Sequence, residues 1–150
     1  MSAVEEVYLD TSALLPYYRE EATSSTTEDF LLDLTPPVLL SDLTRVEFAS
    51  AVARWVRMEE ISSALAGLVE DTFWQEQQSG LFAVHQLKRF HFTRAERWLQ
   101  DRGTSLRTLD ALHLACCWEQ NALLVTCDNL MHGSAEHLGL KSLLIQPERG

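Results

Sequence analysis

Residues 122–128 read Ala-Leu-Leu-Val-Thr-Cys-Asp, and this stretch decides the expected fold. Its apolar run has the length of a strand, and its composition is that of a strand buried on both faces, so we predict a strand over residues 122–127. The stretch Val-Tyr-Leu-Asp at residues 7–10 has the same form, at the end of a predicted strand over residues 4–9. Both stretches predict buried strands that each end next to an aspartate.

Helical spacing of apolar residues fills most of the chain between these two strands. We predict further strands over residues 38–40, 81–87 and 143–145, and helices over residues 12–18, 23–34, 41–58, 61–78, 92–102, 107–121 and 129–137. Gly103 is expected to close the fifth of these helices, and Gly133 to interrupt the last. Strands that alternate with helices predict an α/β fold, a three-layer α/β/α sandwich with a mainly parallel central sheet. The 150 residues suit one domain over residues 1–150.

Composition places the chain among ordinary globular proteins, with 46% hydrophobic and 23% charged residues. The first ten residues lack the basic region of a secretory signal, and no apolar stretch approaches the ~20 residues that span a bilayer. We therefore expect a cytoplasmic protein without membrane contact. The three cysteines, Cys116, Cys117 and Cys127, are expected to be reduced core residues, because Cys116 and Cys117 do not have the spacing of zinc ligands.

The net charge of −10 bears on the choice of partners. Proteins that grip nucleic acid through its phosphates usually present a basic face. An acidic chain can still bind nucleic acid if bound cations neutralise a carboxylate cluster and its few arginines share one surface. The same charge also suits a basic protein partner.

Four carboxylates are the candidate functional residues. Asp10 and Asp128 follow two strands, and ligands of open parallel sheets bind beyond the carboxyl ends of the strands. Glu47 and Asp110 lie inside helices that read as buried, where a carboxylate is costly unless it is paired or binds a cation. The structural alternatives are helix caps for Asp10 and Asp128, and ion pairs with Arg45 or Arg107, or simple exposure, for Glu47 and Asp110.

Together these four carboxylates predict an oxygen-rich site for a hard divalent cation, Mg²⁺ or Mn²⁺. Such an ion neutralises a scissile phosphate, activates a water and stabilises the leaving oxygen. Arg107, one turn before Asp110, is the best candidate for contact with an RNA phosphate, and Arg45 is a second candidate.

Four segments resemble the signature blocks of a known family: residues 7–18 (VYLDTSALLPYY), 43–54 (LTRVEFASAVAR), 106–115 (LRTLDALHLA) and 123–140 (LLVTCDNLMHGSAEHLGL). These blocks are similar to those of PIN-domain ribonucleases, above all the toxins of VapBC-type toxin–antitoxin systems. The resemblance implies a compact α/β/α fold in which Asp10, Glu47, Asp110 and Asp128 hold the divalent metal. It also implies that Ser12 supports the site by hydrogen bonding, and a cap for the first helix is an alternative role that is compatible with it. Asn129 is either a supplementary residue of the metal site or a turn residue.

The resemblance further implies a metal-dependent endoribonuclease, the toxin of a toxin–antitoxin pair. The expected partners are an RNA substrate, a second copy of the chain packed through residues 41–78, and a small antitoxin whose basic segment reaches the acidic site. The alternative is a catalytically silent binding module of the same fold. A third interpretation, a phosphatase with Asp10 as nucleophile, ranks last because the position two residues later holds Ser12 and not a second acid.

Overall fold

A five-stranded parallel sheet forms the centre of the computed structural model, which describes residues 5–19 and 24–147. The strands lie in the order β3-β2-β1-β4-β5, and every neighbouring pair is parallel. Their bounds are Val7–Leu9 for β1, Val38–Ser41 for β2, Phe82–His85 for β3, Leu123–Thr126 for β4 and Ser142–Leu144 for β5. The predicted parallel sheet is confirmed, with β1 and β4, the two strands that precede Asp10 and Asp128, side by side.

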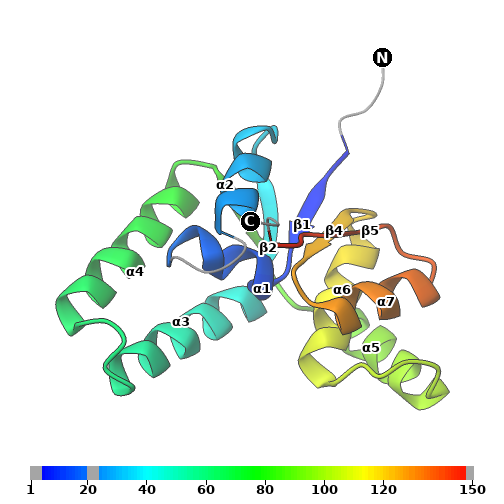
Figure 1. The fold of residues 1–150 in the computed structure, drawn as a ribbon. Helices are drawn as coiled ribbons and strands as arrows, with labels where there is room; N and C mark the ends of the chain where they lie inside the picture. Colours follow the sequence, from blue (N-terminus) through cyan, green and yellow to red (C-terminus); the bar gives the residue numbers. More distant parts are fainter. Residues whose placement is uncertain (1–4, 20–23, 148–150) are drawn as a thin grey trace.

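Helices connect the strands and cover both faces of the sheet (Figure 1). They are α1 (Thr11–Leu14), the 3₁₀ helix η1 (Leu15–Tyr17), α2 (Ser24–Leu32), α3 (Asp42–Arg57), α4 (Ser63–Gln78), α5 (Arg89–Asp101), α6 (Thr108–Glu119) and α7 (Asn129–His137). In Figure 1, α3 and α4 lie on one side of the strands, and α5, α6 and α7 lie on the other. The predicted three-layer α/β/α arrangement is therefore confirmed.

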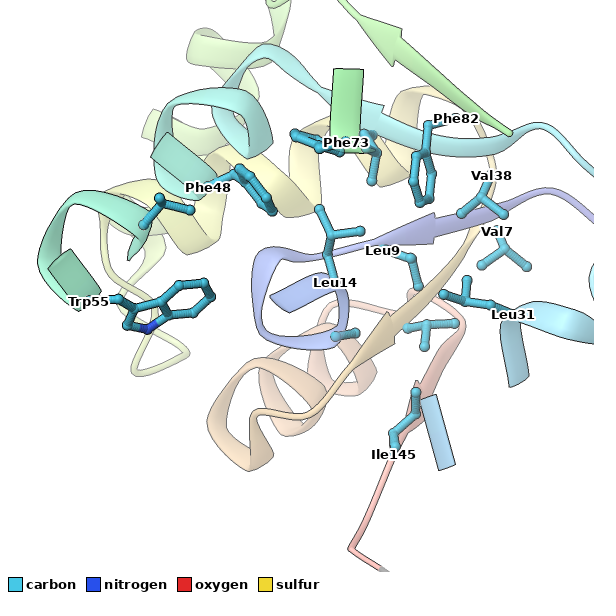
Figure 2. Packing of buried hydrophobic residues seen from close by; sticks show 14 of the residues in the cluster. Val7, Leu9, Leu14, Leu31, Val38, Phe48, Trp55, Phe73, Phe82 and Ile145 are labelled. Carbon is cyan, nitrogen blue, oxygen red and sulfur yellow. The ribbon is translucent and has the colours of Figure 1, made fainter. Parts of the chain in front are cut away.

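Alternate residues of the central strands point to opposite faces of the sheet and pack into two separate hydrophobic cores. In β1, Val7 and Leu9 pack with residues of α3 and α4, whereas Tyr8 packs with residues of α6 and α7. Figure 2 shows the first of these cores, in which Phe48 and Phe73 lie close together on one side of β1. This division follows from the period of two of a β-strand, and it fixes which side chains point toward the candidate site.

Two helices differ most from the sequence prediction. The first predicted helix, over residues 12–18, is split into α1 and η1, because Pro16 has no backbone N–H with which to continue the α-helical bonding. Helix α5 begins three residues earlier than predicted, at Arg89, since the backbone N–H of Lys88 donates to the ring of the buried His91 at 2.9 Å. The predicted starts at residues 4 and 23 lie outside the described residues.

Two glycines have other roles than predicted. Helix α5 is closed by Arg102, which takes the left-handed conformation (φ 55°), and not by Gly103. Gly103 instead gives room to His137, whose ring nitrogen would lie 3.0 Å from a Cβ at this position. Gly133 lies inside α7 and does not interrupt it.

No helix within the described ranges is long and apolar enough to cross a membrane.

Candidate functional site

The end of β1 leads directly into the most buried carboxylate, Asp10, which is 6% exposed. Its Oδ1 accepts hydrogen bonds from Ser12 Oγ at 2.7 Å and from the backbone N–H of Ala13 at 3.2 Å. Its Oδ2 accepts from Thr126 Oγ1 at 2.8 Å. Burial raises the pKa of Asp10, and these hydrogen bonds offset only part of that effect. Hydrogen bonds therefore fix the orientation of the Asp10 carboxylate, and its burial makes the charged form less favourable.

Asp128 lies two residues after the end of β4. Its Oδ1 accepts from the backbone N–H groups of Leu130 (2.8 Å) and Met131 (3.2 Å), so it caps α7. Its own N–H donates to Thr126 Oγ1 at 3.0 Å, and the hydroxyl of Thr126 donates in turn to Asp10. One hydroxyl therefore links the two strand-end aspartates. Both are helix caps, as the structural alternative predicted. Asp128 Oδ2 accepts no hydrogen bond from a described residue, whereas both oxygens of Asp10 accept at least one.

Glu47, on the second turn of α3, faces the same region. Its Oε1 accepts from Thr11 Oγ1 at 2.7 Å and is hydrogen-bonded to His113 Nε2. Partial burial acts to raise the pKa of Glu47, but the hydrogen bond and the attraction from His113, with the hydrogen bond from Thr11, outweigh it and lower that pKa. Glu47 is therefore held in its ionised form. The sequence offered Arg45 as its ion-pair partner, but the partner is His113.

His113 connects Glu47 to the core. It is 3% exposed, and its Nδ1 lies 2.6 Å from the hydroxyl of Tyr8, which lies 2.9 Å from Ser41 Oγ. Burial raises the pKa of Tyr8, so its hydroxyl keeps its proton. A continuous chain of polar groups thus runs from Ser41 at the end of β2 through β1 and α6 to Glu47.

Asp110 lies in the first turn of α6, where its Oδ2 accepts from the backbone N–H of Arg107 at 3.3 Å. It lines a pocket of about 480 Å³ together with Glu47, Asp128 and Arg107. The sequence placed Glu47 and Asp110 inside helices that read as buried, with simple exposure as an alternative. Residues 111–117 of α6 are indeed buried, but Asp110 lies at the open end of this helix and is partly exposed, next to Leu109, which is 46% exposed. Glu47 is also partly exposed at the pocket.

The chemistry of this donor set fits a divalent cation. Glu47 Oε2, Asp110 Oδ1 and Asp128 Oδ2 accept no hydrogen bond from any described residue, and hard cations bind such oxygens. Across the described ranges, however, no three Asp, Glu, His or Cys side chains are grouped to hold an ion as they stand. Like-charged carboxylates repel each other in the absence of a cation. Binding would require these side chains to draw together around the pocket.

Of the other predicted site residues, some lie at the site and others do not. Ser12 touches Asp10, and its Oγ also accepts from the backbone N–H of Cys127 at 3.0 Å, so it ties α1 to the end of β4. Arg107 lines the pocket, whereas Asn129 and Arg45 are exposed and are not among its lining residues. Sequence reasoning missed Tyr8, Thr11 and Thr126. Thr11 and Thr126 are polar residues that flank strand-end aspartates, which was the available signal.

Comparison with known proteins places the chain in a family. The family model of the PIN domain matches residues 7–133. The chain belongs to the PIN-domain family. No curated protein sequence matches it significantly.

Solved structures of the same fold are only distantly related in sequence. A chain of the FitAcB structure from Neisseria gonorrhoeae is 16% identical, with a TM-score of 0.72 over 91% of this chain and 96% of that one. VapC20 of Mycobacterium tuberculosis, described as a toxin that cleaves the sarcin-ricin loop, is 14% identical, with a TM-score of 0.67 over 86% and 95%. A chain of VapBC2 from Rickettsia felis, bound to a fragment of promoter DNA, is 14% identical, with a TM-score of 0.65 over 93% and 98%. At these identities the likeness establishes the PIN fold alone.

Proposed function

We propose that this PIN-domain protein is a divalent-metal-dependent endoribonuclease and the VapC-like toxin of a toxin–antitoxin pair. The observation that carries the proposal is the pocket at the carboxyl edge of the sheet, where Glu47, Asp110 and Asp128 line one hollow and Thr126 links Asp128 to Asp10. The cleavage activity in the description of VapC20 supports the same conclusion.

The residues have separate roles in this proposal. Asp10, Glu47, Asp110 and Asp128 would hold Mg²⁺ or Mn²⁺, which neutralises the scissile phosphate and makes an attacking water more acidic. Arg107, on the pocket wall, would contact a phosphate of the substrate. Ser12 and His113 keep Asp10 and Glu47 oriented through the hydrogen bonds described above. Asn129 and Arg45 do not line the pocket and have no assigned role in this proposal.

Burial argues against the phosphatase interpretation. A nucleophilic aspartate must reach the phosphorus atom, but Asp10 is 6% exposed and both of its oxygens accept hydrogen bonds. Asp10 is suited to a role at the base of a metal site and not to attack on a substrate.

The proposed partners follow from charge and from the relatives. A small antitoxin with a basic segment would satisfy the carboxylates of the pocket in the absence of RNA, and the FitAcB and VapBC2 structures are named as two-component assemblies. A homodimer would pack through α3 and α4, which carry the exposed apolar residues Val46, Leu65 and Leu68.

The decisive experiment is cleavage of total RNA by wild type and by Asp110→Asn, each with Mg²⁺, with Mn²⁺ and with EDTA. Wild type should cleave with a metal and stop in EDTA. Asp110→Asn should be slower by roughly two orders of magnitude, because loss of even an outer-shell partner costs about 10–100-fold. Asp101→Asn, at the exposed end of α5, is the matched control and should cleave normally.

Two results would contradict the proposal. Cleavage that survives EDTA would exclude the metal site, and absence of cleavage with every metal would favour the catalytically silent binding module.

A further inference from the structure

Positive charge is concentrated in one part of this acidic protein. Residues 88–107 contain six of the twelve lysines and arginines but only two of the 22 acidic residues, a net charge of +4, whereas the rest of the chain carries −14. These residues form α5 and the loop that leads into α6. A chain with an overall charge of −10 therefore contains a basic segment, residues 88–107. This segment reaches the pocket, because its last residue, Arg107, lines the pocket.

A groove on this element combines arginines with exposed aromatic rings. It has a volume of about 540 Å³ and is lined by Arg89, Phe90, Thr93, Arg94 and Arg97 of α5 and by Trp118 of α6. No lining residue is acidic. Phe90 and Trp118 are 43% and 40% exposed, so both rings offer a face or an edge to a ligand.

The arginines of this groove form no ion pair with a carboxylate of the described residues. Among the described residues, none of Arg89, Arg94 and Arg97 has an acidic group within 4.0 Å, whereas Arg19 on the other side of the sheet pairs with Glu60 at 2.8 Å. The guanidinium of Arg94 lies 4.2 Å from the ring centre of Trp118 and 5.9 Å from that of Trp98. This stacking holds a cation and an aromatic surface together without neutralising the cation.

We propose that this groove binds single-stranded RNA that flanks the cleavage site, a proposal that rests on the ribonuclease function proposed above. Arginines would contact phosphates, while Trp118 and Phe90 stack on bases, which is the general mode of single-strand binding. Helix α6 carries Asp110 near its start and Trp118 eight residues later, about 12 Å along the helix axis at 1.5 Å per residue. A strand of a few nucleotides spans this length. The alternative ligand is an acidic protein segment. It would pair with the arginines, but it has no bases to stack on the exposed rings.

The test measures binding of a labelled 15-nucleotide single-stranded RNA by fluorescence anisotropy at several salt concentrations. The parent protein is Asp110→Asn in EDTA, which should bind without cutting because cleavage needs the metal. Adding Arg94→Ala and Arg97→Ala should weaken binding at least tenfold and reduce the slope of log affinity against log salt by about 1.4, at ~0.7 for each phosphate contact. Adding Trp118→Ala should weaken binding by about fivefold or more without changing this slope, and Trp118→Phe should restore most of it.

The matched control is Arg54→Ala with Arg57→Ala, two exposed arginines with the same spacing on α3. This control should bind RNA as the parent does, and circular dichroism should show that every variant is folded. Equal affinity and equal salt slope for the Arg94/Arg97 variant and its parent would overturn the proposal. It would also be overturned if the groove variants bound RNA normally but lost binding to an acidic peptide, because the occupant would then be a protein.

Failure of this inference is distinguishable from failure of the proposed function. If wild type cleaves RNA with metal but the groove variants bind normally, only the groove is wrong. If wild type never cleaves but RNA binding depends on Arg94, Arg97 and Trp118, the protein is an RNA-binding module and only the catalytic proposal fails.

Discussion

Asp10 shows how the site and the stability of the protein oppose each other at a single residue. Its carboxylate is almost fully buried and its pKa is raised by that burial, so keeping it ionised at neutral pH costs stability. An amide of the same shape could still accept from Ser12 and Ala13 and could donate to Thr126. Under the proposed function, cation binding accounts for a carboxylate at this position, where an amide would serve folding equally well.

We expect Asp10→Asn to have an unfolding temperature equal to or higher than that of wild type in EDTA. Addition of Mg²⁺ or Mn²⁺ should raise the unfolding temperature of wild type, and this rise should vanish in Asp10→Asn, because a ligand stabilises only the form that binds it. Thermal unfolding followed by fluorescence measures both effects. Asp33→Asn, at an exposed aspartate, should keep the rise. A metal-induced rise that persists in Asp10→Asn would show that the ion binds elsewhere.

His113 contributes both to the core and to the site. His113→Leu removes the partner of the buried Tyr8 hydroxyl and of Glu47, and we expect it to lower the free energy of unfolding by about 1–3 kcal/mol in urea titrations. His113→Gln retains a donor for Glu47 and should recover part of this loss. Equal stabilities for wild type and His113→Leu would mean that the polar chain from Ser41 to Glu47 has no net structural value.

At the scale of elements, the site is assembled from strand–helix junctions. Asp10 caps α1 and Asp128 caps α7, and Ser41 begins α3 at the end of β2. Because the strands are parallel, these helix starts gather at one edge of the sheet, where helix dipoles favour negative charge. The same geometry that caps the helices therefore brings the carboxylates together.

Helix α4 separates a packed face from an exposed one within two adjacent residues. Phe73 is 5% exposed and packs on Phe48 with ring centres 4.2 Å apart, whereas Trp74 is 53% exposed. We expect Phe73→Ala to lower the free energy of unfolding by about 3–5 kcal/mol. Trp74→Ala should change it by about 0.5 kcal/mol or less. Urea unfolding of both variants checks the assignment, and a large loss for Trp74→Ala would indicate that its ring is covered by a partner.

The cysteines of α6 should be unreactive in the folded protein. Burial raises the pKa of Cys116 to about 11 and that of Cys117 to about 12, so both remain thiols at pH 8. We expect iodoacetamide to modify neither residue until urea unfolds the chain, as measured by mass spectrometry of peptides. Since unfolded thiols lose their protons near pH 9.0, the free energy of unfolding should also fall as the pH rises from about 9 toward 11. Rapid modification of Cys117 in the native protein would contradict the packing of α6.

At the scale of the whole molecule, three regions divide the surface. The acidic pocket lies at the carboxyl edge of the sheet, the basic groove lies on α5 and α6, and exposed apolar residues lie on α3 and α4. This division suits a protein that meets a metal, a nucleic acid and a protein partner on different faces. If the groove binds RNA as proposed, it explains how a chain with a net charge of −10 can bind a polyanion.

The apolar surface of α3 and α4 predicts a homodimer in solution. We expect sedimentation equilibrium to show a dimer for wild type and a monomer for Leu65→Glu with Leu68→Glu, because charges at a packed interface would be buried without partners. Leu32→Glu, at a residue of α2 that is 83% exposed, should remain dimeric. Wild type that stays monomeric at about 100 μM would refute the dimer and leave this face to another partner.

The sequence by itself determined the order of strands and helices, the parallel sheet and the four carboxylates as candidates. These features depend on local information: periods of 2 and 3.6 in the apolar residues, strand-end aspartates and recognisable blocks. Local information also explains the errors. The start of α5 depends on the contact between Lys88 and His91, three residues apart, which apolar spacing does not show. The exposure of Glu47 depends on neighbours that are distant in sequence, such as His113.

Only the tertiary structure decided how the carboxylates are held and what surrounds them. The hydrogen bonds from Thr126 to Asp10, from Thr11 to Glu47 and between Tyr8 and His113 join residues 36 to 116 positions apart, and each depends on strand order and register. The basic groove likewise needs α5 and α6 to pack so that Trp118 meets Arg94. Such contacts exist only after the sheet has formed, because no local pattern specifies which distant residue a side chain will meet.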